Sequence, residues 1–396
     1  MEGDQMNIGI FTDTYAPEIN GVAMSIRWFR TALEKAGHRT FVFAPSQNHD
    51  FREEKKERIW RFPSVAFYGY KQVRFVLPFV HASAIPPVPF DIIHTHTPGT
   101  LGLRGLAYAR AHGIPVIHTY HTFFEAYVRY AHLPNVIVKP LARILSRVLL
   151  SRHDAVIAPS RGMKKILEAY GVEIPIHVLP TGIDPARIAR LSMKPSGKSF
   201  FAEYGIDPKR HKILITASRL GYEKNIPFLL DAFRRIKAEV PSAKFVVVGD
   251  GPARESLIQE TERLGLASDV VFAGFLPHET LFPLYRAAKL FVFASRTETQ
   301  GLVILEAMAT GLPVVAVHAM GVEDALEDGV GGVLVPEDSA VFARETISLL
   351  RSASRYRKAQ QETTKKAGRY SMRASSRKLL SLYQNTILWK RQNEVH

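Results

Sequence analysis

The chain contains no cysteine among its 396 residues. Disulfide bridges, thiol nucleophiles and thiolate metal sites are therefore excluded, and this composition agrees with a reducing compartment. No run of 18 consecutive apolar residues occurs, and the start, MEGDQMNIGIF, lacks a basic segment followed by an apolar core. Neither a membrane-spanning helix nor a signal peptide is expected, so the sequence predicts a cytoplasmic protein.

Acidic residues are too few to balance the basic ones, and the formal net charge is +15. Residues 1–197 carry 24 Lys and Arg against 15 Asp and Glu, residues 198–343 carry 15 against 19, and residues 344–396 carry 13 against 3. Phosphorylated substrates, an anionic membrane surface or nucleic acid would each explain this excess. Nucleic acid is not expected as a partner, because no RNA-binding motif or zinc finger accompanies the charge.

Apolar runs of strand length alternate with amphipathic segments of helix length. This pattern is typical of parallel sheets with crossover helices, and it occurs twice. We therefore predict an α/β protein with two Rossmann-like, doubly wound sheets, which bind ligands beyond the carboxyl ends of their strands. The expected strands are 7–11, 40–44, 91–96, 115–120, 154–160 and 176–180 in the first half, and 212–218, 244–250, 270–274, 290–295, 313–317 and 332–336 in the second.

The length exceeds that of one hydrophobic core, which favours two domains. The stretch LSMKPSGKSF, residues 191–200, is rich in turn-forming residues and predicts the boundary. We expect domains at 1–197 and 198–370, and a helix at 371–396 that crosses back to the first domain.

Two loops of the second half carry candidate anion-binding groups. Arg219 and Lys224 follow the strand expected at 212–218, where they can grip a diphosphate. Gly251 lies in a Gly-Asp-Gly-Pro turn between an expected strand and helix, where free amides can hold an anion. The alternative for Arg219 and Lys224 is a solvated loop with two surface charges. The alternative for the Gly-Asp-Gly-Pro turn is a plain connection between strand and helix.

The segment TETQGLVILEAMATG, residues 297–311, places Glu298 in a loop and Glu306 on the helix that Gly301 begins. Carboxylates at both ends of this span can accept hydrogen bonds from the hydroxyls of a sugar or ribose. The amides of Gln300, Gly301 and Leu302 can bind further oxygens, and glycine permits a close backbone approach. The alternative for Glu306 is an ordinary helix glutamate paired with a neighbouring cation.

The order of these motifs, followed by GLPVVA, resembles the nucleotide-sugar domain of the family 4 retaining glycosyltransferases of GT-B architecture. The resemblance implies that Arg219 and Lys224 bind the donor diphosphate and stabilise the leaving group. It also implies that Glu306 binds the ribose and that Glu298 contacts the transferred sugar. The donor-binding set is Gly21, Gly251, Arg219, Lys224, Glu298, Thr299, Gln300, Gly301, Leu302 and Glu306.

The first half is similar to bacterial diacylglycerol glucosyltransferases in FTDTYAPEINGVAMSI (11–26), IIHTHTPGTLGL (92–103) and HTYHTFFEAYVRY (118–130). This resemblance implies transfer of glucose from UDP-glucose to diacylglycerol, with a GDP-mannose-dependent mannosyltransferase acting on a lipid as the alternative. It places Gly21 beside the donor phosphate and makes His121 an active-site histidine. Asp13 and Tyr15 are placed on the acceptor side.

No cofactor or metal is expected, because no Asp-x-Asp pair occurs and Arg219 and Lys224 can neutralise the diphosphate. A different class of function, a metal-dependent hydrolase, would use His94, His96, His118 and His121 as ligands of zinc or iron. A third hypothesis is a non-catalytic protein of the same fold that binds a membrane or nucleic acid.

A basic amphipathic helix is expected within KPLARILSRVLLSR, residues 139–152. Lys139, Arg143 and Arg147 recur every four residues beside a row of leucine, isoleucine and valine, so the helix can lie in an anionic bilayer interface. We therefore expect peripheral association with the inner face of the plasma membrane. The alternative is a surface helix whose apolar side packs on the core. The charge-poor stretch at 74–90 is a candidate groove for an acyl chain.

Overall fold

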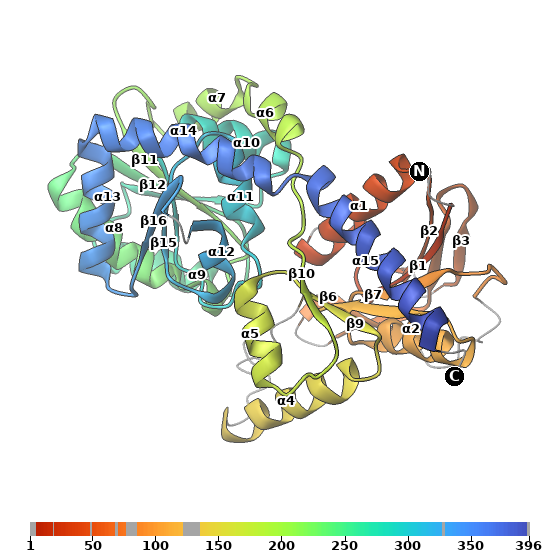
Figure 1. Ribbon diagram of the computed structural model, residues 1–396. Helices are drawn as coiled ribbons and strands as arrows, with labels where there is room; N and C mark the ends of the chain where they lie inside the picture. Colours follow the sequence, from red (N-terminus) through yellow and green to blue (C-terminus); the bar gives the residue numbers. More distant parts are fainter. Residues whose placement is uncertain are drawn as a thin grey trace. The chain divides into compact units, whose positions relative to one another are not determined.

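The computed structural model describes residues 5–18, 20–47, 50–67, 70–76, 85–121, 135–326 and 329–393. The chain divides into two compact units, one made of Met1–Gly182 with Met372–His396 and the other of Ile183–Ser371 (Figure 1). The sequence placed the boundary after residue 197, whereas residues 183–197 belong to the second unit. The reason is that LSMKPSGKSF contributes to helices, and α6 (Pro185–Ser192) packs against α10 (His278–Ala287).

The first unit is built on an eight-stranded sheet with the strand order β10-β9-β8-β7-β1-β2-β4-β3. All neighbours pair in parallel except β3 and β4. The strands are β1 (Asn7–Phe11), β2 (Arg39–Pro45), β3 (Arg52–Glu54), β4 (Ile59–Phe62), β7 (Ile92–Thr95), β8 (Val116–Thr119), β9 (Ala155–Ala158) and β10 (Ile176–Val178), with a separate hairpin of β5 (Ser64–Phe67) and β6 (Tyr70–Val76). The helices are α1 (Gly21–Lys35), α2 (Thr100–Ala111), α4 (Asn135–Leu150), α5 (Arg161–Ala169) and α15 (Met372–Asn393).

The second unit is built on a six-stranded sheet with the strand order β13-β12-β11-β14-β15-β16, parallel throughout. Its strands are β11 (Lys212–Ala217), β12 (Ala243–Val248), β13 (Val270–Gly274), β14 (Leu290–Phe293), β15 (Val314–Val317) and β16 (Gly332–Val335). Besides α6 and α10, its helices are α7 (Ser196–Glu203), α8 (Ile226–Glu239), α9 (Arg254–Arg263), α11 (Leu302–Ala309), α12 (Met320–Leu326), α13 (Ser339–Arg351) and α14 (Ala353–Arg369).

Buried apolar strands explain both sheets. In β1 and β2, Phe11 stacks on Phe43 with ring centroids 4.2 Å apart, and Phe90 meets Phe43 edge-on at 6.0 Å. In the second unit, Phe245 and Phe233 join the strands to α8 at 5.5 Å. Because both faces of these strands are covered, they consist of nearly continuous apolar residues. The two predicted parallel sheets are thus confirmed, with strand ends within two residues of the expected ranges.

The helix α15 returns to the first unit, where it lies beside α1 (Figure 1). Leu379, Leu382, Tyr383 and Ile387 enter a core cluster with residues of β1 and α1. Of the helices within the described ranges, none combines the length and apolar character needed to cross a bilayer. Within the candidate acyl groove at 74–90, residues 77–84 lie outside the described part, while Ile85 and Phe90 are buried in an aromatic core.

Candidate active site

The strand order of the second unit changes direction between β11 and β14, and the predicted cations lie at that point. Arg219 and Lys224 follow β11, while Glu298 follows β14. Lys224 Nζ donates to Glu298 Oε1 at 2.5 Å, and these side chains are only 17% and 18% exposed. Arg219 Nη2 donates to Glu223 Oε1 at 3.0 Å. Each cation is therefore held by a carboxylate at the edge where doubly wound sheets bind ligands.

The Gly-Asp-Gly turn packs directly on the loop that carries Arg219. Gly249 has φ +126°, and a Cβ atom there would lie 1.8 Å from the carbonyl oxygen of Ser218. A Cβ atom on Gly251 would lie 2.6 Å from the carbonyl oxygen of Leu220. The Leu220 amide in turn donates to the carbonyl of Asp250 at 2.9 Å. Both glycines are thus required for packing, which gives Gly251 a role in positioning the neighbouring loop.

The loop that contains Glu298 turns into α11 at Gly301, as the sequence predicted. Gly301 is the N-terminal cap of the helix and has φ +69°, a left-handed conformation that glycine adopts readily. Thr299 and Leu302 are half-buried, and Gln300 is buried. A Cβ atom on Gly321, in α12, would approach the carbonyl oxygen of Glu298 to 2.3 Å. Sequence reasoning missed Gly321, although it follows β15 in a strand-turn-helix sequence that signals a close approach.

Glu306 points into the second unit and is only 7% exposed. Its Oε1 lies 3.7 Å from Nε2 of His278, on α10. Burial raises the pKa of Glu306 to about 8, while the positive charge of Arg187 opposes this shift. At neutral pH the carboxyl group is therefore largely protonated, and it can donate as well as accept a hydrogen bond. His278 was not predicted, because no local motif marks a histidine that contacts the site from another helix.

The hydroxyl group of Tyr285 lies in the same buried region. It has no hydrogen-bond partner among the described residues, and burial raises the pKa of Tyr285 well above its ordinary value, with the nearby Glu306 as a smaller cause. An unpaired buried hydroxyl costs free energy unless a ligand or water satisfies it. Tyr285 is thus a second polar group near Glu306 that the sequence did not reveal.

In the first unit, Asp13 and Tyr15 are buried with partners of their own. The Asp13 carboxylate accepts hydrogen bonds from Thr97 Oγ1 at 2.6 Å, Thr100 Oγ1 at 2.8 Å and the amide of Leu101 at 2.9 Å. Burial nevertheless raises the pKa of Asp13, since these hydrogen bonds oppose but do not cancel the desolvation. The Tyr15 hydroxyl accepts from Arg30 Nη1 at 3.3 Å. Asp13 therefore caps α2, and both side chains hold the loop after β1.

Gly21 begins α1, and its surroundings are open. The Asn20 side chain caps the helix by accepting from the amide of Ala23 at 2.9 Å. Among the described residues, a Cβ atom on Gly21 would meet no atom within 4 Å. Gly21 is exposed, so a ligand has room beside the start of this helix.

The four histidines proposed as metal ligands make hydrogen bonds instead of converging. His96 Nδ1 and His121 Nε2 are 3.0 Å apart, and His118 Nδ1 lies 2.7 Å from Thr95 Oγ1. Within the part of the chain that the structure describes, no three His, Asp or Glu side chains are arranged to hold a metal ion. Glu125, the carboxylate that follows His121 in the sequence, lies outside the described residues. The geometry gives the metal-hydrolase hypothesis no support.

Helix α4 presents apolar side chains to solvent. Leu141, Ile144, Leu145 and Val148 are 49%, 59%, 58% and 54% exposed, whereas Ala142, Ser146 and Leu150 are buried. Arg143 and Arg147 are exposed beside this row, and Arg147 pairs with Glu173 at 3.4 Å. The side chain of Lys139 lies outside the described residues. The alternative, in which the apolar side packs on the core, does not hold for this row, because Ala142, Ser146 and Leu150 form the buried side.

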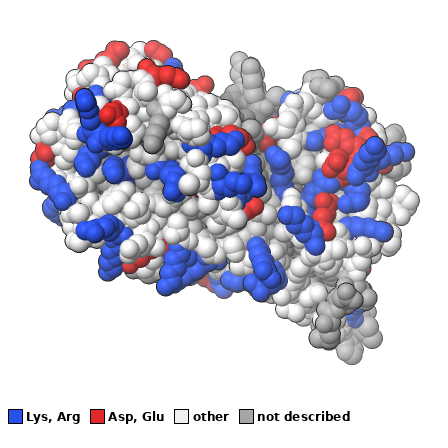
Figure 2. All heavy atoms as spheres, turned by 90° about the horizontal axis from the view of Figure 1, so that it is seen from above, with Lys and Arg blue, Asp and Glu red and all other residues white. Residues whose placement is uncertain are grey.

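Basic side chains stand in several groups over the face drawn in Figure 2, with acidic residues in smaller patches between them.

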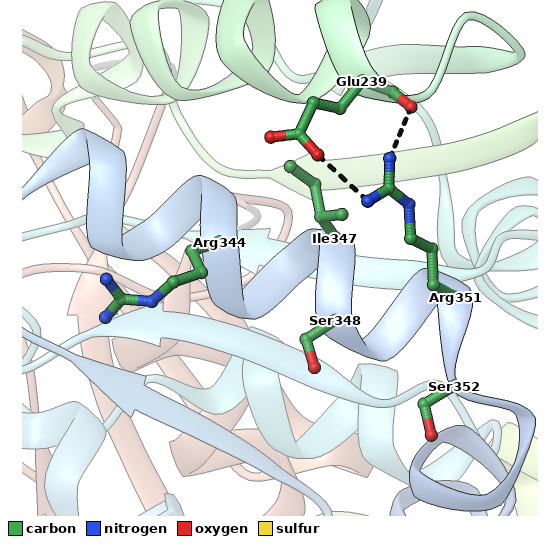
Figure 3. Close-up of a pocket in the computed structure, with 6 residues that line it drawn as sticks. All are labelled: Glu239, Arg344, Ile347, Ser348, Arg351 and Ser352. Atoms are coloured by element: carbon green, nitrogen blue, oxygen red, sulfur yellow. Dashed lines mark hydrogen bonds and ion pairs between the residues drawn. The ribbon is translucent and has the colours of Figure 1, made fainter.

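A hollow of about 430 Å³ lies between α8 and α13, lined by Glu239, Arg344, Ile347, Ser348, Arg351 and Ser352 (Figure 3). Arg351 is held there by Glu239 at 3.0 Å. Because Glu239 ends α8, just before β12, the hollow lies at the amino-terminal edge of the sheet. The candidate site lies at the opposite edge.

Comparisons with known proteins agree with this geometry. The model of Glycosyltransferase Family 4 matches residues 19–187, and that of Glycosyl transferases group 1 matches residues 211–352. The chain is 41% identical over 315 residues to the alpha-monoglucosyldiacylglycerol synthase of Streptococcus pneumoniae, covering 78% of this chain and 71% of that protein. It is 27% identical over 346 residues to the enzyme of the same name from Acholeplasma laidlawii, covering 83% and 84%.

Solved structures share the fold. The Anabaena protein HepE, in complex with UDP and glucose, matches with a TM-score of 0.74 at 20% identity and covers 96% of this chain and 100% of its own. These relationships leave the metal-dependent hydrolase and the non-catalytic binding protein without support. The chain belongs to glycosyltransferase family 4 and is a hexosyltransferase of GT-B architecture.

Proposed function

We propose that the protein transfers glucose from UDP-glucose to diacylglycerol at an anionic membrane surface, with retention of the anomeric configuration. The similarity to two enzymes named alpha-monoglucosyldiacylglycerol synthase supports this substrate pair. The observation that carries the lipid acceptor is the exposed apolar row of α4 beside Arg143 and Arg147. A large exposed apolar row requires a partner, and a bilayer interface satisfies both its apolar and its basic side chains.

The donor diphosphate is bound by Arg219 and Lys224 in this proposal. Negative charge grows on the diphosphate as its bond to glucose breaks, and a preorganised cation stabilises that charge most in the transition state. Lys224 is held in place by Glu298, and Arg219 by Glu223, before the donor binds. Because these cations can neutralise the leaving group, transfer requires no resident metal ion.

The remaining donor contacts come from the loop of Glu298 and from Glu306. The segment from Thr299 to Leu302 offers backbone amides at the start of α11, and Glu298 contacts the transferred glucose. Glu306 binds the ribose as a buried acid, and its protonated oxygen can donate to a hydroxyl while the other accepts. Gly21 supplies an open helix start for the donor phosphate. His121 acts beside the sugar, and Asp13 and Tyr15 hold the loop on the acceptor side.

Transfer with three donors tests this function. Consumption of UDP-glucose, UDP-galactose and GDP-mannose is measured with and without diacylglycerol in anionic vesicles, after treatment with EDTA, and the anomer of the product is assigned by NMR. We expect lipid-dependent consumption of UDP-glucose that survives chelation and gives an α-linked product. A preference for GDP-mannose would instead assign a mannosyltransferase acting on a lipid. Turnover without a lipid acceptor would overturn the membrane role.

Removing the basic side chains of α4 should weaken membrane binding. Each Lys or Arg near an anionic surface contributes about 1 kcal/mol, so replacing Lys139, Arg143 and Arg147 by serine should weaken binding to vesicles about a hundredfold. Vesicle sedimentation measures this effect, and titration with UDP checks that donor binding is unchanged.

The matched control replaces Arg27, Lys35 and Arg39, three exposed basic residues in the same unit, by serine. Equal losses in the two variants would indicate a general effect of net charge and would remove α4 from the proposal. Replacing Leu145 by serine tests the apolar contribution separately, since it leaves the charge unchanged and should also weaken vesicle binding.

A further inference from the structure

A line of buried side chains joins His121 to the helix α15. His121 Nε2 and His96 Nδ1 are hydrogen-bonded at 3.0 Å. The ring of His96 packs on that of His94, with centroids 3.9 Å apart. His94 Nδ1 is in turn hydrogen-bonded to the hydroxyl of Tyr383 at 2.8 Å. All these residues belong to the first unit, although Tyr383 is 289 positions away from His94 in the sequence.

His94 is fixed at both of its ring nitrogens. While Nδ1 contacts Tyr383, Nε2 is hydrogen-bonded to Thr119 Oγ1 at 2.6 Å. Both His94 and Tyr383 are buried, so no water competes for these bonds. Hydrogen bonds at both ring nitrogens restrict the rotation of the His94 ring, and this ring is the surface on which His96 packs.

Burial and the hydrogen-bond partners of each ring set the protonation of these histidines. Burial lowers the pKa of His94 and His96 well below the ordinary value, and it lowers the pKa of His121 to about 4. Each ring is thus neutral and carries one N–H group, whose position follows from the partner at each nitrogen. The bond to Tyr383 therefore helps to decide which nitrogen of His94 is protonated. The bond to His96 does the same for His121.

We propose that Tyr383 is a positioning residue for His121, acting through His94 and His96 from the far end of the chain. The effect on catalysis rests on the proposed function, in which His121 lies beside the sugar. Small displacements of a catalytic group can cost up to about a hundredfold in rate. Removal of one hydroxyl, two side chains away, should therefore lower kcat by about tenfold and change KM for UDP-glucose little.

The test replaces Tyr383 by phenylalanine, which keeps the ring in the core and removes the hydroxyl. Thr386→Val is the matched control, because Thr386 is buried one turn further along α15. Its hydroxyl donates to the carbonyl of Leu382 at 2.8 Å, its one partner among the described residues. Thr119→Val removes the hydrogen bond at the other ring nitrogen of His94, Nε2. Long-range proton–nitrogen NMR of the histidine rings reports the tautomer and environment of His121, and steady-state kinetics give kcat and KM.

We expect Tyr383→Phe and Thr119→Val to shift the ring signals of His121 and to lower kcat, while Thr386→Val changes neither. Unchanged His121 signals in Tyr383→Phe would overturn the proposal, as would a fall in kcat of the same size in Thr386→Val. If the wild-type protein transfers no glucose to lipid, the proposed function fails. The NMR comparison still decides whether Tyr383 acts on His121.

Discussion

Replacement of Lys224 by alanine is expected to lower kcat for glucosyl transfer by about 10²- to 10³-fold, with a much smaller change in the affinity for UDP. The Nζ atom stands at the switch point of the sheet, 2.5 Å from Glu298 and shielded from water. A charge in such a site acts with little screening on the negative charge that develops on the leaving diphosphate. Single-turnover measurements with UDP-glucose separate this effect from product release.

The fall in kcat in the Lys224 variant has two origins, which a second substitution at Glu298 separates. Alanine removes the cation, and it also leaves the Glu298 carboxylate unpaired beside the diphosphate. The double variant Lys224→Ala/Glu298→Gln should recover part of any loss that is due to this repulsion. Lys244→Ala is the matched control, because Lys244 is 19% exposed and pairs with Asp269 at 2.8 Å. It lies at the amino-terminal end of β12, at the edge of the sheet away from the candidate site. Normal turnover in the Lys224 variant would contradict the leaving-group role.

The second large effect concerns the stability of the unliganded protein. The pKa of Glu306 is about 8 in the fold, above its ordinary value of 4.5. Between these values the folded state holds a proton that the unfolded state has released, so stability falls as the pH rises. Each pH unit costs about 1.4 kcal/mol, and from pH 5 to pH 8 the wild type should lose about 4 kcal/mol relative to Glu306→Gln.

Denaturant unfolding at pH 5, 6, 7, 8 and 9 measures this difference, which should level off above the folded pKa, where both states are ionised. Glutamine keeps the shape and the neutral charge of the buried acid, so the variant lacks the penalty. The control is Glu323→Gln, since Glu323 also faces a histidine, His318, at 3.4 Å but lies in contact with water. A difference between wild type and Glu306→Gln that stays constant over this range would show that Glu306 is ionised in the fold.

The sequence could predict the meeting of Lys224 and Glu298, although they are 74 positions apart. Each follows a buried parallel strand, and the carboxyl ends of such strands share one edge. The cap at Gly301 was predictable for a similar reason, because a glycine between an apolar strand and an apolar helix indicates a left-handed turn. Features that depend on strand polarity and on turn chemistry are thus encoded locally.

Other features depend on which side of a helix meets its neighbours. Glu306 had the same sequence signal whether it faced solvent or the core, and its burial follows from the packing of α11 near α10. The sequence predicted that the apolar residues of α4 form a row along the helix. Whether that row is exposed depends on the residues of the opposite side, where the small residues Ala142 and Ser146 are buried. Strand β4 was not predicted, because the run IWRF is short, contains an arginine and follows a charged segment.

The return of α15 to the first unit has a consequence for the order of folding during synthesis. Residues 183–371 are continuous in the chain, so the ribosome delivers the whole second unit before α15 exists. Until then the first unit lacks Leu379, Leu382 and Tyr383, and the apolar residues of β1 and α1 that they cover remain exposed. The part of the chain made first is therefore completed last, and its open core is the surface that nascent-chain chaperones would meet.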